Sequence, residues 1–232
     1  MIPSPLPDET LDSFFDRTLH ILQKKKGYRF SVDAVLLSRF VTIRKDERVV
    51  DLGTGCGILP LFLSLTTRAR SFTGIEVQKD LAEIAGKNVL LNRLSDRVTI
   101  LCEDFRQLRQ VYPSGAFEVV ISNPPYRKSR SGRLNPSAEK AVARHEIMGT
   151  LHDLVSTAAY LLPAKGRFYL IYPASRAVDL VVELRAASLE PKRIQYVHPR
   201  AGEEARFILV ESLKSTGIEV KVMPPLILDG PP

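Results

Sequence analysis

The chain has only two cysteines, Cys56 and Cys102, among its 232 residues, and neither belongs to a pattern with metal-ligand spacing. It also lacks a long apolar run: stretches such as residues 58–65 are too short to span a bilayer. Its first residues have neither the basic start nor the apolar core of a signal peptide. We therefore expect no disulfide, no metal site, no membrane association and a cytoplasmic location with two reduced thiols.

The composition is that of a folded protein, with 44% hydrophobic and 25% charged residues and no internal repeat or low-complexity tract. A chain of this length can bury one substantial core. We divide it into an N-terminal segment of residues 1–45, which we expect to cover the functional site, a main domain of residues 46–223, and a tail of residues 224–232.

Positive charge is in excess, with a formal net charge of +7 and a pI near 9.5. A positive field attracts polyanions, so nucleic acid is the leading class of partner. Basic residues gather in two clusters, which are our candidates for RNA binding: Lys24, Lys25 and Lys26, and then Arg127, Lys128, Arg130 and Arg133.

Short β-rich runs alternate with helical patterns through the middle of the chain. The patterns predict strands over residues 48–52, 71–77, 98–102, 117–122 and 166–172. They predict helices over residues 32–41, 58–67, 79–94, 151–162 and 177–187. Two closing strands, 193–198 and 205–213, have too short a connection for a parallel pair. The predicted fold is an α/β, mostly parallel seven-stranded sheet with helices on both faces and a C-terminal antiparallel hairpin, which resembles the Rossmann-like class I methyltransferases.

A glycine-rich loop joins the first strand of this domain to its helix, in the run Asp51-Leu52-Gly53-Thr54-Gly55-Cys56-Gly57. Glycines there allow a positive φ and let the backbone approach a ligand at the carboxyl edge of the sheet. Asp51 suits the ammonium group of S-adenosylmethionine and would repel a pyrophosphate. The loop therefore predicts a cofactor site formed by Asp51, Gly53, Thr54, Gly55 and Gly57.

Two further acidic residues end the next two strands. Glu76, followed by Val77, lies about twenty residues beyond the glycines, where an acid commonly accepts hydrogen bonds from ribose hydroxyls. Asp104 can meet the adenine amino group, with Phe105 beside the ring. Three acids at the ends of three successive strands favour S-adenosylmethionine as the cofactor.

The turn Asn123-Pro124-Pro125-Tyr126 follows the fourth strand. Two prolines cannot continue a strand, so the chain leaves the sheet at its carboxyl edge. The Asn123 oxygen and the Pro124 carbonyl can accept hydrogen bonds from a planar amine, and Tyr126 can stack on its ring. Such bonds favour the tetrahedral nitrogen that forms as the amine attacks a methyl group. No general base is required, because the methylated nitrogen is strongly acidic.

This turn on this scaffold resembles the amino-group methyltransferases. The run Gln23-x-x-x-Gly27-Tyr28-Arg29-Phe30-Ser31-x-Asp33 and the later Ala143-Arg144-His145-Glu146 are similar to the bacterial tRNA (adenine-N6)-methyltransferases that modify valine tRNA. The resemblance implies methylation of the adenine next to the anticodon, flipped into the pocket. An aromatic residue common in that family is replaced here by Arg127-Lys128, and His145-Glu146 fits a helix start better than an acid–base pair.

Other functions share the same motifs. A methyltransferase acting on adenine N6 or guanine N2 of ribosomal RNA has the same chemistry. A glutamine methyltransferase of release factors has the same turn, but it carries a separate helical N-terminal domain, and only about 45 residues precede the first strand here. An inactive RNA-binding subunit is the non-enzymatic alternative, although such proteins usually lose the glycine loop or the Pro-Pro turn, and both are intact here.

Overall fold

The computed structural model describes residues 5–14, 18–26, 29–30, 32–124 and 149–228. Within these ranges no helix is long and apolar enough to cross a lipid bilayer. Neither cysteine forms a disulfide: Cys56 is buried and Cys102 is exposed.

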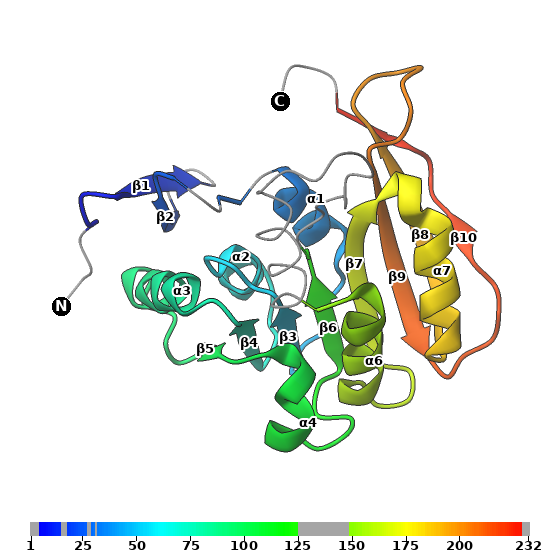
Figure 1. The fold of residues 1–232 in the computed structure, drawn as a ribbon, viewed down its shortest axis with the longest axis horizontal. Coiled ribbons are helices and arrows are strands. Elements are labelled where there is room, and N and C mark those ends of the chain that lie inside the picture. The colour runs from blue at the N-terminus through cyan, green and yellow to red at the C-terminus, as the bar shows by residue number, and fades with distance from the viewer. Residues whose placement is uncertain (1–4, 15–17, 27–28, 31, 125–148, 229–232) are drawn as a thin grey trace, which may run out of the picture.

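The centre of the molecule is a twisted sheet whose main strands run in the order β8-β9-β7-β6-β3-β4-β5 (Figure 1). All neighbours pair in parallel except β9, which is antiparallel to both β7 and β8. The fold class and the C-terminal antiparallel hairpin are thus confirmed. The seven strands are β3 Arg48–Leu52, β4 Ser71–Glu76, β5 Val98–Cys102, β6 Val119–Ser122, β7 Arg167–Pro173, β8 Leu189–His198 and β9 Phe207–Lys214.

Helices cover both faces of the sheet, and each face has its own apolar core. One core lies under α1 Val32–Phe40, α2 Ile58–Thr66 and α3 Lys79–Leu91. The other lies under α4 Leu108–Val111, α6 Leu151–Leu161 and α7 Ala177–Ala186 (Figure 1). Two single 3-10 turns, η1 Phe105–Gln107 and η2 Ala174–Arg176, lead into α4 and α7. Side chains alternate between the two cores along each strand, as the period of a strand requires.

Several predicted ends are wrong by a few residues. Helix α3 ends at Leu91 rather than at residue 94, because Arg93 adopts a left-handed φ of 57°. Strand β6 begins at Val119, since the N–H of Phe117 bonds to the carbonyl of Leu161 at the end of α6. Strand β8 begins at Leu189, four residues before the prediction, and contains an irregularity next to Pro191 that disguised its first half.

The sheet has nine strands rather than the predicted seven. The two extra strands, β10 Lys221–Val222 and β11 Leu226–Ile227, both pair in parallel with β8. Each is only two residues long, and Pro224 and Pro225 lie between them, so no periodic sequence pattern predicts these strands. The sheet therefore extends into the predicted tail.

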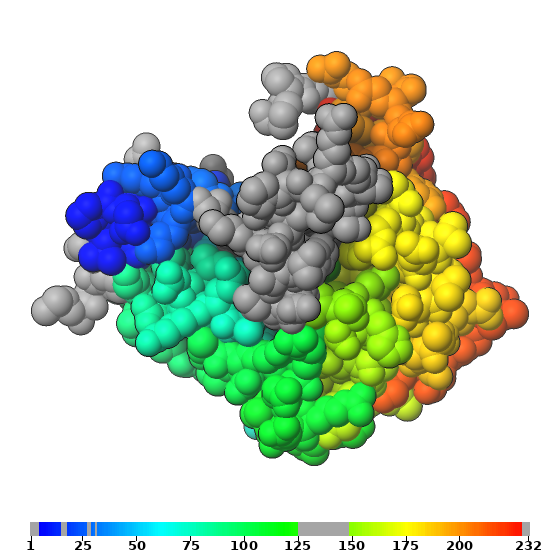
Figure 2. Space-filling view, viewed as in Figure 1, coloured from blue at the N-terminus to red at the C-terminus, as the bar shows by residue number. Residues whose placement is uncertain are grey.

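A separate two-stranded hairpin precedes α1 and was not predicted. It consists of β1 Glu9–Phe14 and β2 Leu19–Lys24. In the space-filling view it lies over α3 at one end of the molecule, opposite the C-terminal strands (Figure 2). Asn88 of α3 and Asn92, which caps the end of that helix, hold it: Asn88 bonds to the N–H and C=O of Leu22, and Asn92 bonds to those of His20. The helix thus offers β2 the pairing that a neighbouring strand would offer.

Candidate active site

The register of the parallel strands brings the predicted site residues to one edge of the sheet. Asp51 is level with Gly74 on β4 and with Ile121 on β6. The residues that follow, Gly53 after β3, Val77 after β4 and Asn123 after β6, consequently leave the sheet side by side. This carboxyl edge is where open α/β sheets bind ligands.

Asp51 is a fully buried carboxylate with no hydrogen-bond partner. Its side chain is 1% exposed, and neither of its oxygens, nor the hydroxyl of the buried Thr54, bonds to another group of the described residues. Burial raises the pKa of the Asp51 carboxyl to about 7, the nearby Thr54 hydroxyl opposes this, and the Glu76 charge adds to it. An unpaired buried carboxylate is costly, and its predicted contact with an ammonium group would compensate this cost.

The glycine loop is held open by its backbone conformation. Gly53, Gly55 and Gly57 have φ angles of 77°, 58° and 85°, values that side-chain-bearing residues rarely adopt. A Cβ on Gly53 would meet no atom within 4 Å, so the space beside it is open. Gly74 has the opposite role, because a Cβ there would lie 2.9 Å from the Thr54 side chain. The backbone can therefore approach a ligand at Gly53 while the loop packs against β4.

Glu76 has a second role that the sequence did not reveal. Its carboxylate is 3% exposed, and Oε2 accepts a 2.9 Å hydrogen bond from the N–H of Gly55. Oε1 accepts a 2.9 Å bond from the N–H of Gln78. Each oxygen keeps acceptor capacity beyond these bonds, as a ribose contact would need. Glu76 thus fixes the glycine loop against β4 in addition to its predicted contact.

Asp104 and Phe105 follow β5 at the same edge. The Asp104 carboxylate accepts a bond from the N–H of Arg106 and forms an ion pair with the Arg106 side chain. The Phe105 ring packs against Gly149, where a Cβ would lie 2.7 Å from Cζ. Both side chains are half-buried, as is Val77. Asp104 is therefore held in place by its own turn, and its adenine contact stays a prediction.

Only the first half of the Pro-Pro turn is described. Asn123 and Pro124 are half-buried at the end of β6. The buried Ser122 donates a 2.7 Å hydrogen bond to the carbonyl of Leu52, which ties the start of the turn to the start of the glycine loop. The remaining predicted residues lie outside the described ranges: Pro125, Tyr126, Arg127, Lys128, Arg130, Arg133, His145 and Glu146.

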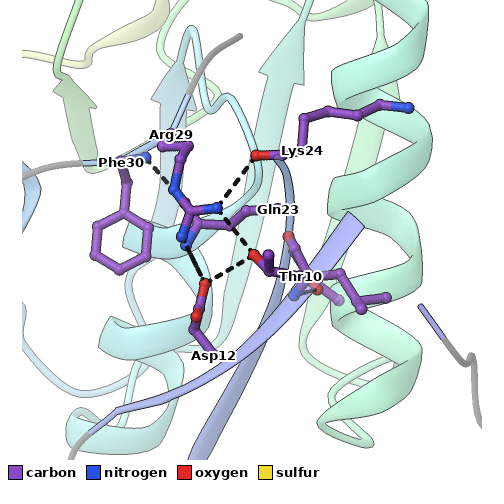
Figure 3. Close-up of polar contacts among 8 residues, drawn as sticks. Thr10, Asp12, Gln23, Lys24, Arg29 and Phe30 are labelled. Carbon is purple, nitrogen blue, oxygen red and sulfur yellow. Dashed lines mark hydrogen bonds and ion pairs between the residues drawn. The ribbon is translucent and has the colours of Figure 1, made fainter. Parts of the chain in front are cut away.

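The N-terminal signature residues hold the approach to α1 against the hairpin (Figure 3). Gln23 accepts a bond from the N–H of Phe30 and donates one to Asp12. Arg29 forms a 2.8 Å ion pair with Asp12 and also donates to Thr10 and to the carbonyl of Lys24. The signature that suggested the family thus has a structural explanation in this network.

The lysine cluster of residues 24–26 is partly engaged in local contacts. Lys24 forms a 2.8 Å ion pair with Asp8, and Lys25 donates to the carbonyl of Pro7. Lys26 is exposed. Its role in RNA binding, like that of its neighbours, stays a prediction.

Nucleophilic catalysis by the loop cysteine has no support in the geometry. Cys56 is buried, and burial raises the pKa of its thiol to about 12, so the thiol stays protonated. Among the described residues, no group of three or more His, Cys, Asp or Glu side chains could hold a metal ion. What the edge does offer is an acidic, glycine-lined surface for a cationic ligand beside an Asn-Pro turn.

A family model for the methyltransferase small domain matches residues 31–183 of the chain. The chain belongs to this family. Two bacterial methyltransferases with the name tRNA1(Val) (adenine(37)-N6)-methyltransferase are similar over most of it. That of Porphyromonas gingivalis strain ATCC 33277 is 30% identical and covers 86% of the chain and 80% of its own length. That of Tolumonas auensis is 27% identical and covers 85% of the chain and 81% of its own length. The resemblance stated from the sequence is confirmed.

Solved structures agree with the methyltransferase fold. A crystal structure from Agrobacterium tumefaciens, described as a predicted O-methyltransferase, superimposes with a TM-score of 0.69 at 25% identity and covers 85% of this methyltransferase and 88% of its own chain. The geranyl diphosphate C-methyltransferase of Streptomyces coelicolor, solved with S-adenosyl-L-homocysteine, gives a TM-score of 0.60 at 14% identity, covering 79% and 78%. At the latter identity the likeness concerns the fold alone.

Proposed function

We propose that this protein transfers the methyl group of S-adenosylmethionine to the N6 amine of an adenine in tRNA. The observation that carries the proposal is the buried Asp51 carboxylate, which accepts no hydrogen bond from the described residues and lies beside an open glycine loop and the Asn123-Pro124 turn. The names of the relatives add the substrate: valine tRNA at adenine 37.

The described residues fit this cofactor. Asp51 would receive its ammonium group, the open space at Gly53 would take the amino-acid portion, and Glu76 and Asp104 would receive the ribose and the adenine. When bound, S-adenosylmethionine supplies an electrophilic methyl group on sulfur. The acids at the edge are complementary to the positive charge of such a ligand, and they would repel a pyrophosphate.

The turn would supply the acceptors for the substrate amine. Asn123 and Pro124 leave β6 directly beside the glycine loop, to which Ser122 ties them. Hydrogen bonds from the amine to the Asn123 side-chain oxygen and the Pro124 carbonyl would strengthen as nitrogen becomes tetrahedral. The protein's contribution to the chemical step is orientation and transition-state stabilisation.

The substrate is tested with tritiated S-adenosylmethionine and separate pools of tRNA, ribosomal RNA and protein, followed by nucleoside mass spectrometry. We expect N6-methyladenosine in the tRNA pool, and loss of the label when a valine tRNA transcript carries guanine in place of the target adenine. Label in guanine N2, in ribosomal RNA or in glutamine would assign the site to one of the alternative amine substrates.

The role of the turn is tested by Asn123→Ala. We expect kcat for tRNA methylation to fall about 100-fold or more, because an acceptor that acts in the transition state is lost. Cofactor affinity, measured by isothermal titration, should stay within about twofold of the wild-type value. Asn92→Ala, which removes the asparagine that caps the end of α3, away from the turn, serves as the control. An equal loss of cofactor affinity in Asn123→Ala would mean that the residue is structural.

A further inference from the structure

A basic groove lies at the opposite end of the sheet from the glycine loop. It has a volume of about 770 Å³. It lies between the start of β7, the first half of β8 and the end of β9 on one side and the segment that contains β10 on the other. Its lining is Thr42, Arg44, Arg167, Lys192, Arg193, Glu211, Leu213, Glu219, Val220 and Lys221. None of these residues belongs to the candidate active site.

Helix α1 ends beside the groove, and a segment without a helix follows it. Arg167 and Tyr169 on β7 are level with Leu213 and Glu211 on β9, and alternation directs all four toward the α1 face. Helix α1 ends at Phe40, whose ring centroid lies 4.1 Å from the Arg193 guanidinium. Residues 41–47 continue without a helix, and the carbonyl of Thr42 accepts hydrogen bonds from the buried Arg167 and Tyr169, so this segment forms one side of the groove.

The charges of the groove do not balance. Its lining has five cationic side chains and two carboxylates. Arg193 forms a 2.9 Å ion pair with Glu211, and Arg167 pairs with Glu47 outside the groove. Lys192 donates to the carbonyls of Gly217 and Glu219, which fix its ammonium without neutralising it.

The two remaining cations are exposed. Neither Arg44 nor Lys221 makes an ion pair with any described residue. Together with Lys192 they outnumber Glu219, which forms no ion pair with a described residue, so the groove keeps a net positive charge.

We infer that this groove binds phosphate groups of the RNA backbone, as a docking site distinct from the methylation site. Guanidinium and ammonium groups are the usual donors to phosphate oxygens. No aromatic side chain lines the groove among the described residues, so it lacks the aromatic platforms on which unpaired bases commonly stack. The excess of cationic side chains favours recognition of the RNA through its backbone charge.

The groove lies apart from the Asn123-Pro124 turn. Ser122, next to the turn, is level with Leu170, while Arg167 begins β7 three residues earlier. At about 3.3 Å per residue the groove lies roughly 10 Å or more from the turn along the strands. An RNA with its target adenine in the pocket can reach the groove only through nucleotides other than the target. This inference rests on the proposed function, and it adds that the enzyme holds its RNA substrate at a second place.

The test is the double variant Arg44→Gln/Lys221→Gln, which removes two unpaired charges and keeps most of each side chain. We expect about fivefold weaker tRNA binding at 0.1 M salt and a slope of log K against log salt that is smaller by about 1 to 2. The KM for tRNA should rise by a similar factor while kcat stays unchanged. The matched control is Arg68→Gln/Arg93→Gln, two exposed arginines that make no ion pair with the described residues and lie outside the groove.

Three measurements keep the outcomes distinct. Cofactor affinity, by isothermal titration, should be equal in the wild type and both variants and reports on folding. An unchanged salt slope in the groove variant, or an equal decrease in the control, would overturn the docking site while leaving the proposed function intact. Failure of the wild-type protein to methylate tRNA with the cofactor bound would instead overturn the proposed function.

Discussion

At the scale of single residues, Asp51 is a buried carboxyl group whose ionised form is unfavourable in the free protein. Asp51 is 1% exposed and accepts no hydrogen bond from the described residues, so its ionised form is poorly compensated in the free protein. Its folded-state pKa of about 7 lies well above the ordinary value, so between about pH 4 and pH 7 the folded protein holds a proton there that the unfolded chain releases. A cation bound next to Asp51 would lower its pKa again, because it favours the ionised carboxylate.

Cofactor affinity should therefore depend on pH through Asp51. Below about pH 7 binding requires loss of the Asp51 proton, so we expect affinity to fall as the pH is lowered, by about tenfold per unit well below the pKa. Above pH 7 the Asp51 proton no longer limits binding. Isothermal titration between pH 5.5 and 8.5, in buffers of different ionisation enthalpy, measures both affinity and released protons.

Asp51→Asn is the variant that isolates this effect. Asparagine has nearly the same shape and no titration, so its affinity should be lower at pH 8 and independent of pH. A wild-type profile that is flat from pH 5.5 to 8.5 would contradict the assignment of Asp51 as the ammonium ligand.

At the scale of elements, the hairpin of β1 and β2 is coupled to the cofactor loop through one helix. Asn88 of α3 is completely buried, and its amide bonds at once to the backbone of Leu22 and, at 2.9 Å, to the carbonyl of Cys56 in the glycine loop. The backbones of Leu22 in the hairpin and of Cys56 in the glycine loop are thus both hydrogen-bonded to the Asn88 side chain. Asn92, one turn later, forms hydrogen bonds with His20 of the hairpin and with the carbonyl of Asn88, and none with the glycine loop among the described residues.

Replacing Asn88 should damage both the hairpin and the loop. In Asn88→Ala three buried backbone groups lose their partner, and we expect the free energy of unfolding to fall by about 3 kcal/mol. Cofactor affinity should also fall, since the Cys56 turn loses its anchor. Asn92→Ala should cost about 1 kcal/mol and leave cofactor affinity unchanged. Urea unfolding and titration calorimetry measure the two effects, and equal losses in both variants would refute the coupling.

The elements that could be predicted are those whose sequence pattern matches their burial. Strand β3 has an apolar core next to a glycine loop, and its predicted ends agree with the structure. The β1–β2 hairpin could not be predicted, because Glu9 and Gln23 are buried polar residues and its partner is the side chains of α3. No local pattern encodes a partner that is about 66 positions away in the sequence.

The same limit applies to the site. Glycines and strand-end acids revealed the cofactor edge, since parallel strands must end together. The bond from Gly55 to Glu76 depends on the tertiary arrangement, as does the bond from Ser122 to Leu52. A buried asparagine on the apolar side of a helix, such as Asn88, is the one signal that could have pointed to the hairpin.

At the scale of the whole molecule, the two cores share one sheet, and the cofactor site lies where that sheet meets both. Val50 and Leu52 of β3 belong to one core, while Val49 belongs to the other. A ligand that binds the loop after β3 therefore acts on the cooperative unit as a whole.

We expect cofactor binding to stabilise the entire fold in one transition. At about a hundred times the dissociation constant, the free energy of unfolding should rise by about 2.7 kcal/mol, which for a chain of this size raises Tm by roughly 5–10 °C. Differential scanning calorimetry measures this shift. Asp51→Asn at the same cofactor concentration should show a much smaller shift, and a shift equal to that of the wild type would contradict the ammonium contact.

The order of strands also has a consequence for synthesis on the ribosome. β9 is translated after β7 and β8, yet it lies between them and provides the ladder that joins them. Until Lys214 has left the exit tunnel, the edge of β7 is open, and the apolar run from Phe168 to Tyr172 has no strand on that side. The sheet therefore cannot close until β9 has been made, and until then the open edge of β7 can pair with other strands.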